Sequence, residues 1–183
     1  MSISLILADD HPLTREGMKA YLAKEADFNI LGSYADGESA WAGILQLKPQ
    51  VALLDIRMPG IDGVALARKI KDASLPVASL MLTSYDAQQY VMASLRAGAR
   101  GYVLKTASMD TLSKAIRIVA RGGFYLDSEV ANAVEQEGDF VPEPVSVRER
   151  EVLLVVARGL SGGEIATPLF ISEMTGLKPR ASQ

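Results

Sequence analysis

The first 121 residues alternate between short apolar runs and segments with helical periodicity. The apolar runs have the composition of strands buried within a sheet, and each is followed by apolar positions spaced by three or four residues. This order predicts an α/β fold, in which a parallel sheet is covered by helices on both faces. The predicted strands are residues 4–8, 29–35, 51–55, 77–82 and 101–104.

The helical segments are expected to bury one apolar stripe each against the sheet. Pro12 suits the first turn of the first helix, because its missing N–H has no partner there. The stripes are Leu13, Gly17 and Tyr21 in the first helix, Leu66 and Ile70 in the third, and Leu112, Ala115, Ile116 and Val119 in the fifth.

Right-handed crossovers would make this a five-stranded, doubly wound (βα)5 sheet, and such folds gather functional side chains at the carboxyl ends of the strands. Four of the five predicted strands lead directly into a residue that could carry the chemistry. The second strand ends without an ionisable group, at Ala35 just before Asp36. The candidates at the other four ends are Asp9 and Asp10, then Asp55, then Thr83, then Lys105.

Three clustered carboxylates repel one another and raise one another's pKa values unless a cation lies between them. Ligation by oxygen alone suits a hard cation, so the sequence predicts Mg²⁺ rather than Zn²⁺. The carboxylate of Asp55 could then attack phosphorus and form an acyl phosphate. Lys105 and Thr83 are suited to stabilise the charge that develops on the phosphoryl oxygens.

Composition narrows the class of protein further. The chain has 183 residues and no cysteine, which excludes disulfides and thiolate chemistry. The N-terminus reaches acidic residues too early for a signal peptide, and no apolar run approaches membrane-spanning length, so we expect a cytoplasmic protein without membrane contact. The net charge is −3. Residues 127–147 contain six acidic residues and no basic residue, as expected for a solvated linker.

Residues 1–126 resemble the receiver domain of two-component response regulators, whose fold is flavodoxin/CheY-like. The resemblance rests on the acid pair Asp9 and Asp10, on "LLDIRMPGIDG" around Asp55, and on "MLTS" and "GYVLKT". It implies that Asp55 accepts phosphate from the phosphohistidine of a sensor histidine kinase. Such a regulator controls transcription and is not a dedicated enzyme.

The resemblance also implies the roles of the neighbouring residues. Asp10, Asp55 and the backbone carbonyl of Arg57 would ligate Mg²⁺, with Asp9 acting mainly through water. Lys105 would pair with the phosphoryl group. Thr83 and Tyr102 would be switch residues: Thr83 would hydrogen-bond the phosphoryl group, and Tyr102 would turn inward to fill the space released.

Residues 146–183 resemble the start of a LuxR-type (NarL/FixJ-like) helix-turn-helix domain, and residues 127–145 form the acidic linker before it. The segment departs from the family pattern at Pro168, which falls inside the scaffold helix and costs roughly 3 kcal/mol there. Gly176 and Pro179 then disfavour the recognition helix. We therefore expect an incomplete, partly all-α output segment, and no specific DNA binding in this form unless that domain is complete.

Two rival functions stay open at this point. A receiver of this kind can act by protein–protein interaction alone, without DNA binding. An Mg²⁺-dependent phosphatase with an Asp nucleophile is the second rival, although such enzymes usually carry a D-x-D pair, and here the two acids are adjacent. Phosphorylation is expected to promote a homodimer, through either the first and fifth helices or the fourth helix and fifth strand. His11, the only histidine, is expected to be loop structure rather than a catalytic group.

Overall fold

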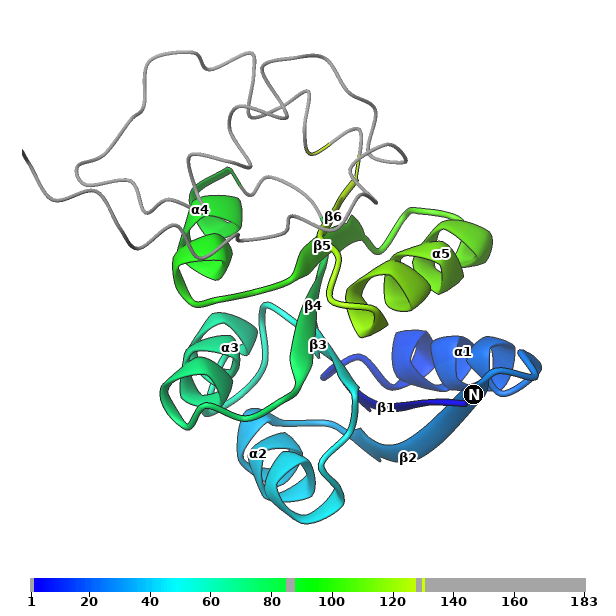
Figure 1. Ribbon diagram of the computed structural model, residues 1–183, viewed down its shortest axis with the longest axis horizontal. Coiled ribbons are helices and arrows are strands. Elements are labelled where there is room, and N and C mark those ends of the chain that lie inside the picture. Colours follow the sequence, from blue (N-terminus) through cyan, green and yellow to red (C-terminus); the bar gives the residue numbers. More distant parts are fainter. Residues whose placement is uncertain (1, 85–87, 128–129, 131–183) are drawn as a thin grey trace, which may run out of the picture.

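The computed structural model describes residues 2–84, 88–127 and 130. They form one parallel sheet with helices on both faces, as the sequence predicts (Figure 1). The strand order β2-β1-β3-β4-β5-β6 places the topological switch point between β1 and β3. The strands are β1 (Ile3–Ala8), β2 (Phe28–Tyr34), β3 (Val51–Asp55), β4 (Ala78–Thr83), β5 (Gly101–Leu104) and β6 (Tyr125–Leu126).

The crossover helices begin at residues that suit a helix N-terminus. Asp36, Asp62 and Ser108 cap α2, α3 and α5, because each side chain accepts a hydrogen bond from a backbone N–H in the first turn. Pro12 lies in the first turn of α1, as predicted. The helices are α1 (Pro12–Leu22), α2 (Gly37–Leu47), α3 (Gly63–Asp72), α4 (Gln88–Arg96) and α5 (Met109–Ala120).

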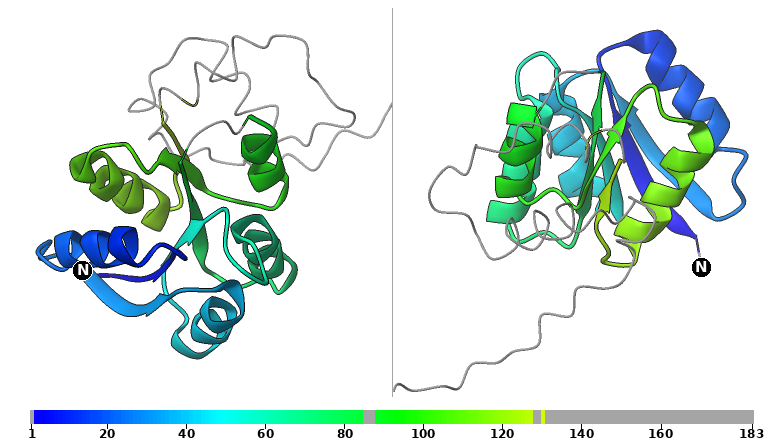
Figure 2. Two further views of the ribbon diagram at one scale, coloured as in Figure 1. Left: turned by 180° about the vertical axis from the view of Figure 1, so that it is seen from behind. Right: turned by 90° about the horizontal axis from the view of Figure 1, so that it is seen from above.

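Each face of the sheet carries its own apolar core. Helices α1 and α5 cover one face, and helices α2, α3 and α4 cover the other (Figure 2). The buried side chains of these helices belong to two separate clusters, one on each face. Burial on both faces explains why the central strands are nearly continuous apolar runs. All five residues of β3 are buried, including the carboxylate-bearing Asp55 at its end.

The predicted stripe of α1 is only partly correct, because Tyr21 packs against the core but Leu13 and Gly17 do not. The helix buries Met18 and Leu22, whereas the side chain of Leu13 is 89% exposed. Gly17 is exposed, and a Cβ added to it would meet nothing within 4 Å. Met18 and Leu22 form a second stripe with the same i, i+4 spacing, one position further along the helix, and the crossover onto the sheet selects that stripe. The stripes predicted for α3 and α5 are correct.

The sixth strand was not predicted, because two residues are too short to show a periodicity. β6 pairs in parallel with β5, and the backbone N–H of Asp127 donates to the carbonyl oxygen of Tyr102 at 3.0 Å. Leu126 is 1% exposed and Val130 is 6% exposed. Asp127 and Val130, which the sequence assigned to the linker, are therefore buried against the domain. The rest of the linker and the whole 146–183 segment lie outside the described residues.

No helix within the described ranges is long and apolar enough to cross a membrane.

The packing of β6 predicts a specific effect on stability. Leu126→Ala should lower the free energy of unfolding by about 2–5 kcal/mol, the usual cost of removing a buried leucine side chain. Leu13→Ala is the matched control and should change it by less than about 0.5 kcal/mol, because Leu13 lies in solvent. Denaturant titration measures both, and equal small effects would show that β6 is not part of the core.

Candidate functional site

The carboxyl ends of β1 and β3 bring the predicted acids together. Ala8 pairs with Leu54 in the sheet, so the residues that follow, Asp9 and Asp55, emerge side by side. Asp9, Asp10, His11 and Asp55 each offer one possible ligand atom, and these four atoms all lie within 4.8 Å of one another. The predicted convergence of three carboxylates at this edge of the sheet is present.

Lys105 reaches this cluster from the end of β5. Its ammonium Nζ lies 2.7 Å from Asp55 Oδ2 and 2.9 Å from Asp9 Oδ2, and its side chain is only 10% exposed. The backbone N–H of Lys105 donates to the carbonyl oxygen of Thr83 at 2.6 Å, which fixes the end of β5 against the end of β4. One ammonium thus bridges carboxylates from two different strands.

Asp9 is fully buried, and its surroundings account for both carboxylate oxygens. Oδ1 accepts a hydrogen bond from the backbone N–H of His11 at 2.8 Å, and Oδ2 faces Lys105. The guanidinium Nη1 of Arg15 donates to the backbone carbonyl oxygen of Asp9 at 2.6 Å. This arrangement leaves Asp10, whose side chain is 33% exposed, as the acid that faces solvent.

The pKa of Asp55 is raised, mainly because the carboxyl group is buried. The hydrogen bond and the charge of Lys105 act in the opposite direction, and the charge of Asp9 adds to the increase. For Lys105, burial acts to lower the pKa, but the hydrogen bonds and charges of Asp55 and Asp9 outweigh it, so the pKa is raised. The ammonium is held in its charged form, while the carboxylates around it remain incompletely neutralised.

The loop after β3 fixes the backbone that follows Asp55, whose side chain is buried at the end of the strand. Gly60 has a φ of +73°, which glycine adopts without steric cost. A Cβ on Gly63 would clash with the carbonyl oxygen of Asp55, so only glycine lets α3 begin so close to the strand. The backbone N–H of Arg57 lies 3.4 Å from Asp55 Oδ1, and its guanidinium lies 5.8 Å from the ring centroid of Tyr90.

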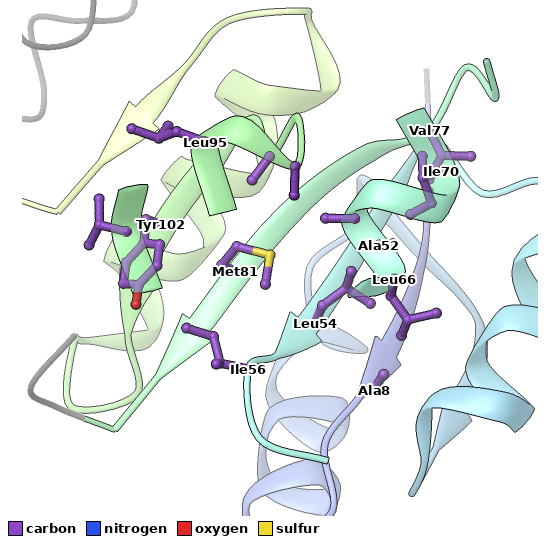
Figure 3. Close-up of a cluster of buried hydrophobic side chains, with 14 of the residues drawn as sticks. Ala8, Ala52, Leu54, Ile56, Leu66, Ile70, Val77, Met81, Leu95 and Tyr102 are labelled. Carbon is purple, nitrogen blue, oxygen red and sulfur yellow. The ribbon is translucent and has the colours of Figure 1, made fainter. Parts of the chain in front are cut away.

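Thr83 is the last residue of β4, and Tyr102 is the second residue of the neighbouring strand β5, where it pairs with Met81. Thr83 is 5% exposed and Tyr102 is 1% exposed. The ring of Tyr102 lies in the apolar core on the α4 side, near Met81 and Leu95 (Figure 3). Burial raises the pKa of Tyr102 to about 12, although the nearby Thr83 side chain acts in the opposite direction. The aromatic ring is already turned inward in this structure.

The side chains present fit a divalent cation. Asp9, Asp10 and Asp55 carry three negative charges, and within the described part of the chain Lys105 is the one ammonium that contacts them. Oxygen ligands of this kind are those that Mg²⁺ prefers, and a cation would offset the repulsion between the acids.

Sequence reasoning missed two contacts at this site. His11 Nδ1 lies 2.7 Å from Asp10 Oδ1, and Arg15 holds the backbone of Asp9. For His11 the signal was present, since it directly follows the acid pair in the chain. For Arg15 the sequence gave no signal, because a contact between a side chain and a backbone carbonyl six residues earlier depends on the path of the loop.

Comparisons with known proteins find matches to both parts of the chain. Residues 5–117 match the family described as response regulator receiver domain, and residues 143–175 match the bacterial regulatory proteins of the luxR family. The transcriptional regulatory protein YxjL of Bacillus subtilis is 37% identical over 182 residues, which cover 94% of this chain and 84% of that protein. The oxygen regulatory protein NreC of Staphylococcus carnosus is 34% identical and covers 94% of this chain and 85% of that protein.

Solved structures show the same fold. The receiver domain of the response regulator NarL from Mycobacterium tuberculosis is 36% identical, with a TM-score of 0.65, and covers 66% of this chain and 98% of that one. The response regulator ChrA of a heme-sensing two-component system is 36% identical, with a TM-score of 0.64, and covers 93% of this chain and 83% of that one.

The fold and the family match define a receiver domain followed by a LuxR-type segment. The chain belongs to the two-component response regulators of the NarL/LuxR family, which regulate transcription. Proteins of this family are in general regulators rather than enzymes.

The charge balance of the site predicts how Asp55→Asn changes stability. Because the ionised form of Asp55 is disfavoured in the folded protein, the variant should melt at a higher temperature than the unsubstituted protein without metal at pH 7. This advantage should vanish as the pH falls through the raised pKa of Asp55 and below its ordinary value of 3.8, because the carboxyl group is then neutral in both the folded and the unfolded state.

Mg²⁺ should reverse the order of the two melting temperatures, so that the unsubstituted protein melts above Asp55→Asn. A cation at 100 times its Kd stabilises the unsubstituted protein by about 2.7 kcal/mol, and Asp55→Asn should lose most of this gain. Asp72→Asn, at an exposed position near the end of α3, is the control and should respond to Mg²⁺ like the unsubstituted protein. Thermal unfolding with and without Mg²⁺ measures both effects; equal stabilisation of all three proteins would place the cation elsewhere.

Proposed function

We propose that this chain accepts a phosphoryl group on Asp55 from the phosphohistidine of a sensor histidine kinase and thereby controls transcription. The single observation that carries the proposal is the contact of Lys105 with both Asp55 and Asp9 beside the more exposed Asp10. This arrangement leaves one carboxylate placed rigidly at a strand end, with an ammonium beside it and further acids that favour a cation. The family match supports the same reaction.

The transfer would proceed by attack of an Asp55 carboxylate oxygen on the phosphorus of the donor. The bond from phosphorus to the donor's imidazole nitrogen breaks, the new bond to oxygen forms, and the imidazole leaves with the electron pair and takes up a proton. Lys105 would lie next to the charge on the phosphoryl oxygens, where its ammonium stabilises the transition state and the product. Thr83 would donate a hydrogen bond to the same group.

Mg²⁺ would be held by Asp10, Asp55 and the backbone carbonyl of Arg57, and it would supply a positive charge that neutralises the phosphoryl oxygens. Asp9 would act mainly through water, because one of its oxygens faces Lys105 and the other accepts the N–H of His11. Its backbone is further fixed by Arg15.

Phosphorylation would act on the rest of the chain by shifting a pre-existing equilibrium. Movement of Thr83 towards the phosphoryl group would change the space available to Tyr102, whose ring is held inward in this structure. Tyr102 also accepts a backbone hydrogen bond from Asp127, at the start of the chain that leads to the LuxR-type segment. The predicted homodimer on phosphorylation would form through either α1 and α5 or α4 and β5.

DNA is the expected partner of the LuxR-type segment in this family. Among the relatives, RcsB has been solved as two dimers bound to two parallel DNAs, and that chain is 26% identical to this one with a TM-score of 0.69. Our expectation that residues 146–183 do not bind DNA specifically concerns residues outside the described ranges, so it stays a prediction. The domain limits 1–126, 127–145 and 146–183 likewise remain part of this proposal.

Phosphorylation itself is tested by intact-mass analysis after treatment with a small-molecule phosphodonor and Mg²⁺. The unsubstituted protein should gain the mass of one phosphoryl group, Asp55→Asn should gain none, and Asp72→Asn should behave like the unsubstituted protein. Chelation of Mg²⁺ should abolish the gain. Modification that persists in Asp55→Asn would contradict the proposal, and continuous release of phosphate from free phosphomonoesters would favour the phosphatase alternative.

A further inference from the structure

His11 is placed at the acid cluster by the local structure of the loop. The backbone N–H of His11 donates to Asp9 Oδ1, a short-range turn that Asp side chains favour. Pro12 then begins α1, so His11 occupies the position before the first helical residue. Its side chain does not cap the helix, which is the usual task of a residue at this position.

The imidazole instead turns towards the acids. His11 Nδ1 lies 2.7 Å from Asp10 Oδ1 and 3.5 Å from Asp9 Oδ1, and the side chain is 65% exposed. Its possible ligand atom lies within 4.8 Å of those of Asp9, Asp10 and Asp55. Two ligands of one ion, each about 2.1 Å from it, stand at most about 4.2 Å apart. The distances from His11 Nδ1 to the oxygens of Asp10 and Asp9 already fall within this range.

We propose that His11 is a nitrogen ligand that sets the metal preference of this pocket and allows it to take Ni²⁺, Co²⁺ or Zn²⁺ in competition with Mg²⁺. Imidazole suits these ions, whereas Mg²⁺ prefers carboxylate, carbonyl and water oxygens. The buried Asp9 supports a cation at this position, since it is 0% exposed and shares the Lys105 ammonium with Asp55. The inference rests on the proposed acid pocket but not on phosphoryl transfer.

The composition of the chain allows a test in which only one side chain can supply an imidazole ligand. His11 is the only histidine among the 183 residues, and there is no cysteine. Imidazole and thiolate are the side chains that bind these metals most strongly in proteins, so in tag-free protein an effect that depends on imidazole reports His11 alone.

The test is calorimetric titration of the full, tag-free chain with Ni²⁺ and with Mg²⁺. For His11→Gln, the Kd for Ni²⁺ should rise by at least about tenfold, while the Kd for Mg²⁺ should change by less than about threefold. Asp55→Asn should weaken the binding of both ions, since they share one pocket. In the unsubstituted protein, added Mg²⁺ should raise the apparent Kd for Ni²⁺.

The visible absorption spectrum of bound Co²⁺ gives a second readout that does not depend on affinity. It should differ between the unsubstituted protein and His11→Gln, because one ligand changes from nitrogen to oxygen. An unchanged ratio of Ni²⁺ to Mg²⁺ affinity in His11→Gln would overturn the inference and leave the Mg²⁺ site standing. Binding of Ni²⁺ that survives in Asp55→Asn would place the metal outside the pocket and overturn it as well. If neither ion binds the unsubstituted protein, the inference and the proposed metal site fail together.

Discussion

The site depends on the contact of one ammonium with two buried carboxylates. Lys105 Nζ lies within 3 Å of an oxygen of both Asp9 and Asp55, and neither acid is more than 3% exposed. Buried carboxylates without a partner would take up protons. Lys105 partly offsets the cost of burying these two carboxylates, but it does not contact the third acid, Asp10. The remaining negative charge favours a cation, and it leaves Asp55 as a nucleophile that is fixed in place.

The sheet topology makes this contact possible. The strand order places β1 beside β3 at the topological switch point, so the acids that follow these strands meet at one edge. Lys105 comes from β5, two strands away from β3, and its long side chain spans β4 to reach both acids. Hydrogen bonding between Lys105 and Thr83 fixes its backbone. The short strand β6 then ties the start of the linker to the backbone of Tyr102.

The sequence predicted the strands and the convergence of the site because both follow from local patterns. Apolar runs that end in a polar residue mark a strand end, and parallel order brings such ends together, which located Asp9, Asp55 and Lys105. The predicted stripe of α1 was wrong at Leu13 and Gly17, because a second stripe with equal spacing competes with it and only packing against the sheet selects Met18 over Leu13. The roles assigned to the site residues remain predictions.

The central claim is that Asp10 and Asp55 hold a divalent cation next to Lys105. The most direct measurement is anomalous diffraction at the manganese edge from a crystal of the chain soaked in Mn²⁺. The account predicts one peak at about 2.0–2.3 Å from a carboxylate oxygen of each acid, with the Lys105 ammonium still in contact with Asp55. A peak remote from both carboxylates, or none in a crystal whose acid cluster is accessible to solvent, would contradict the account.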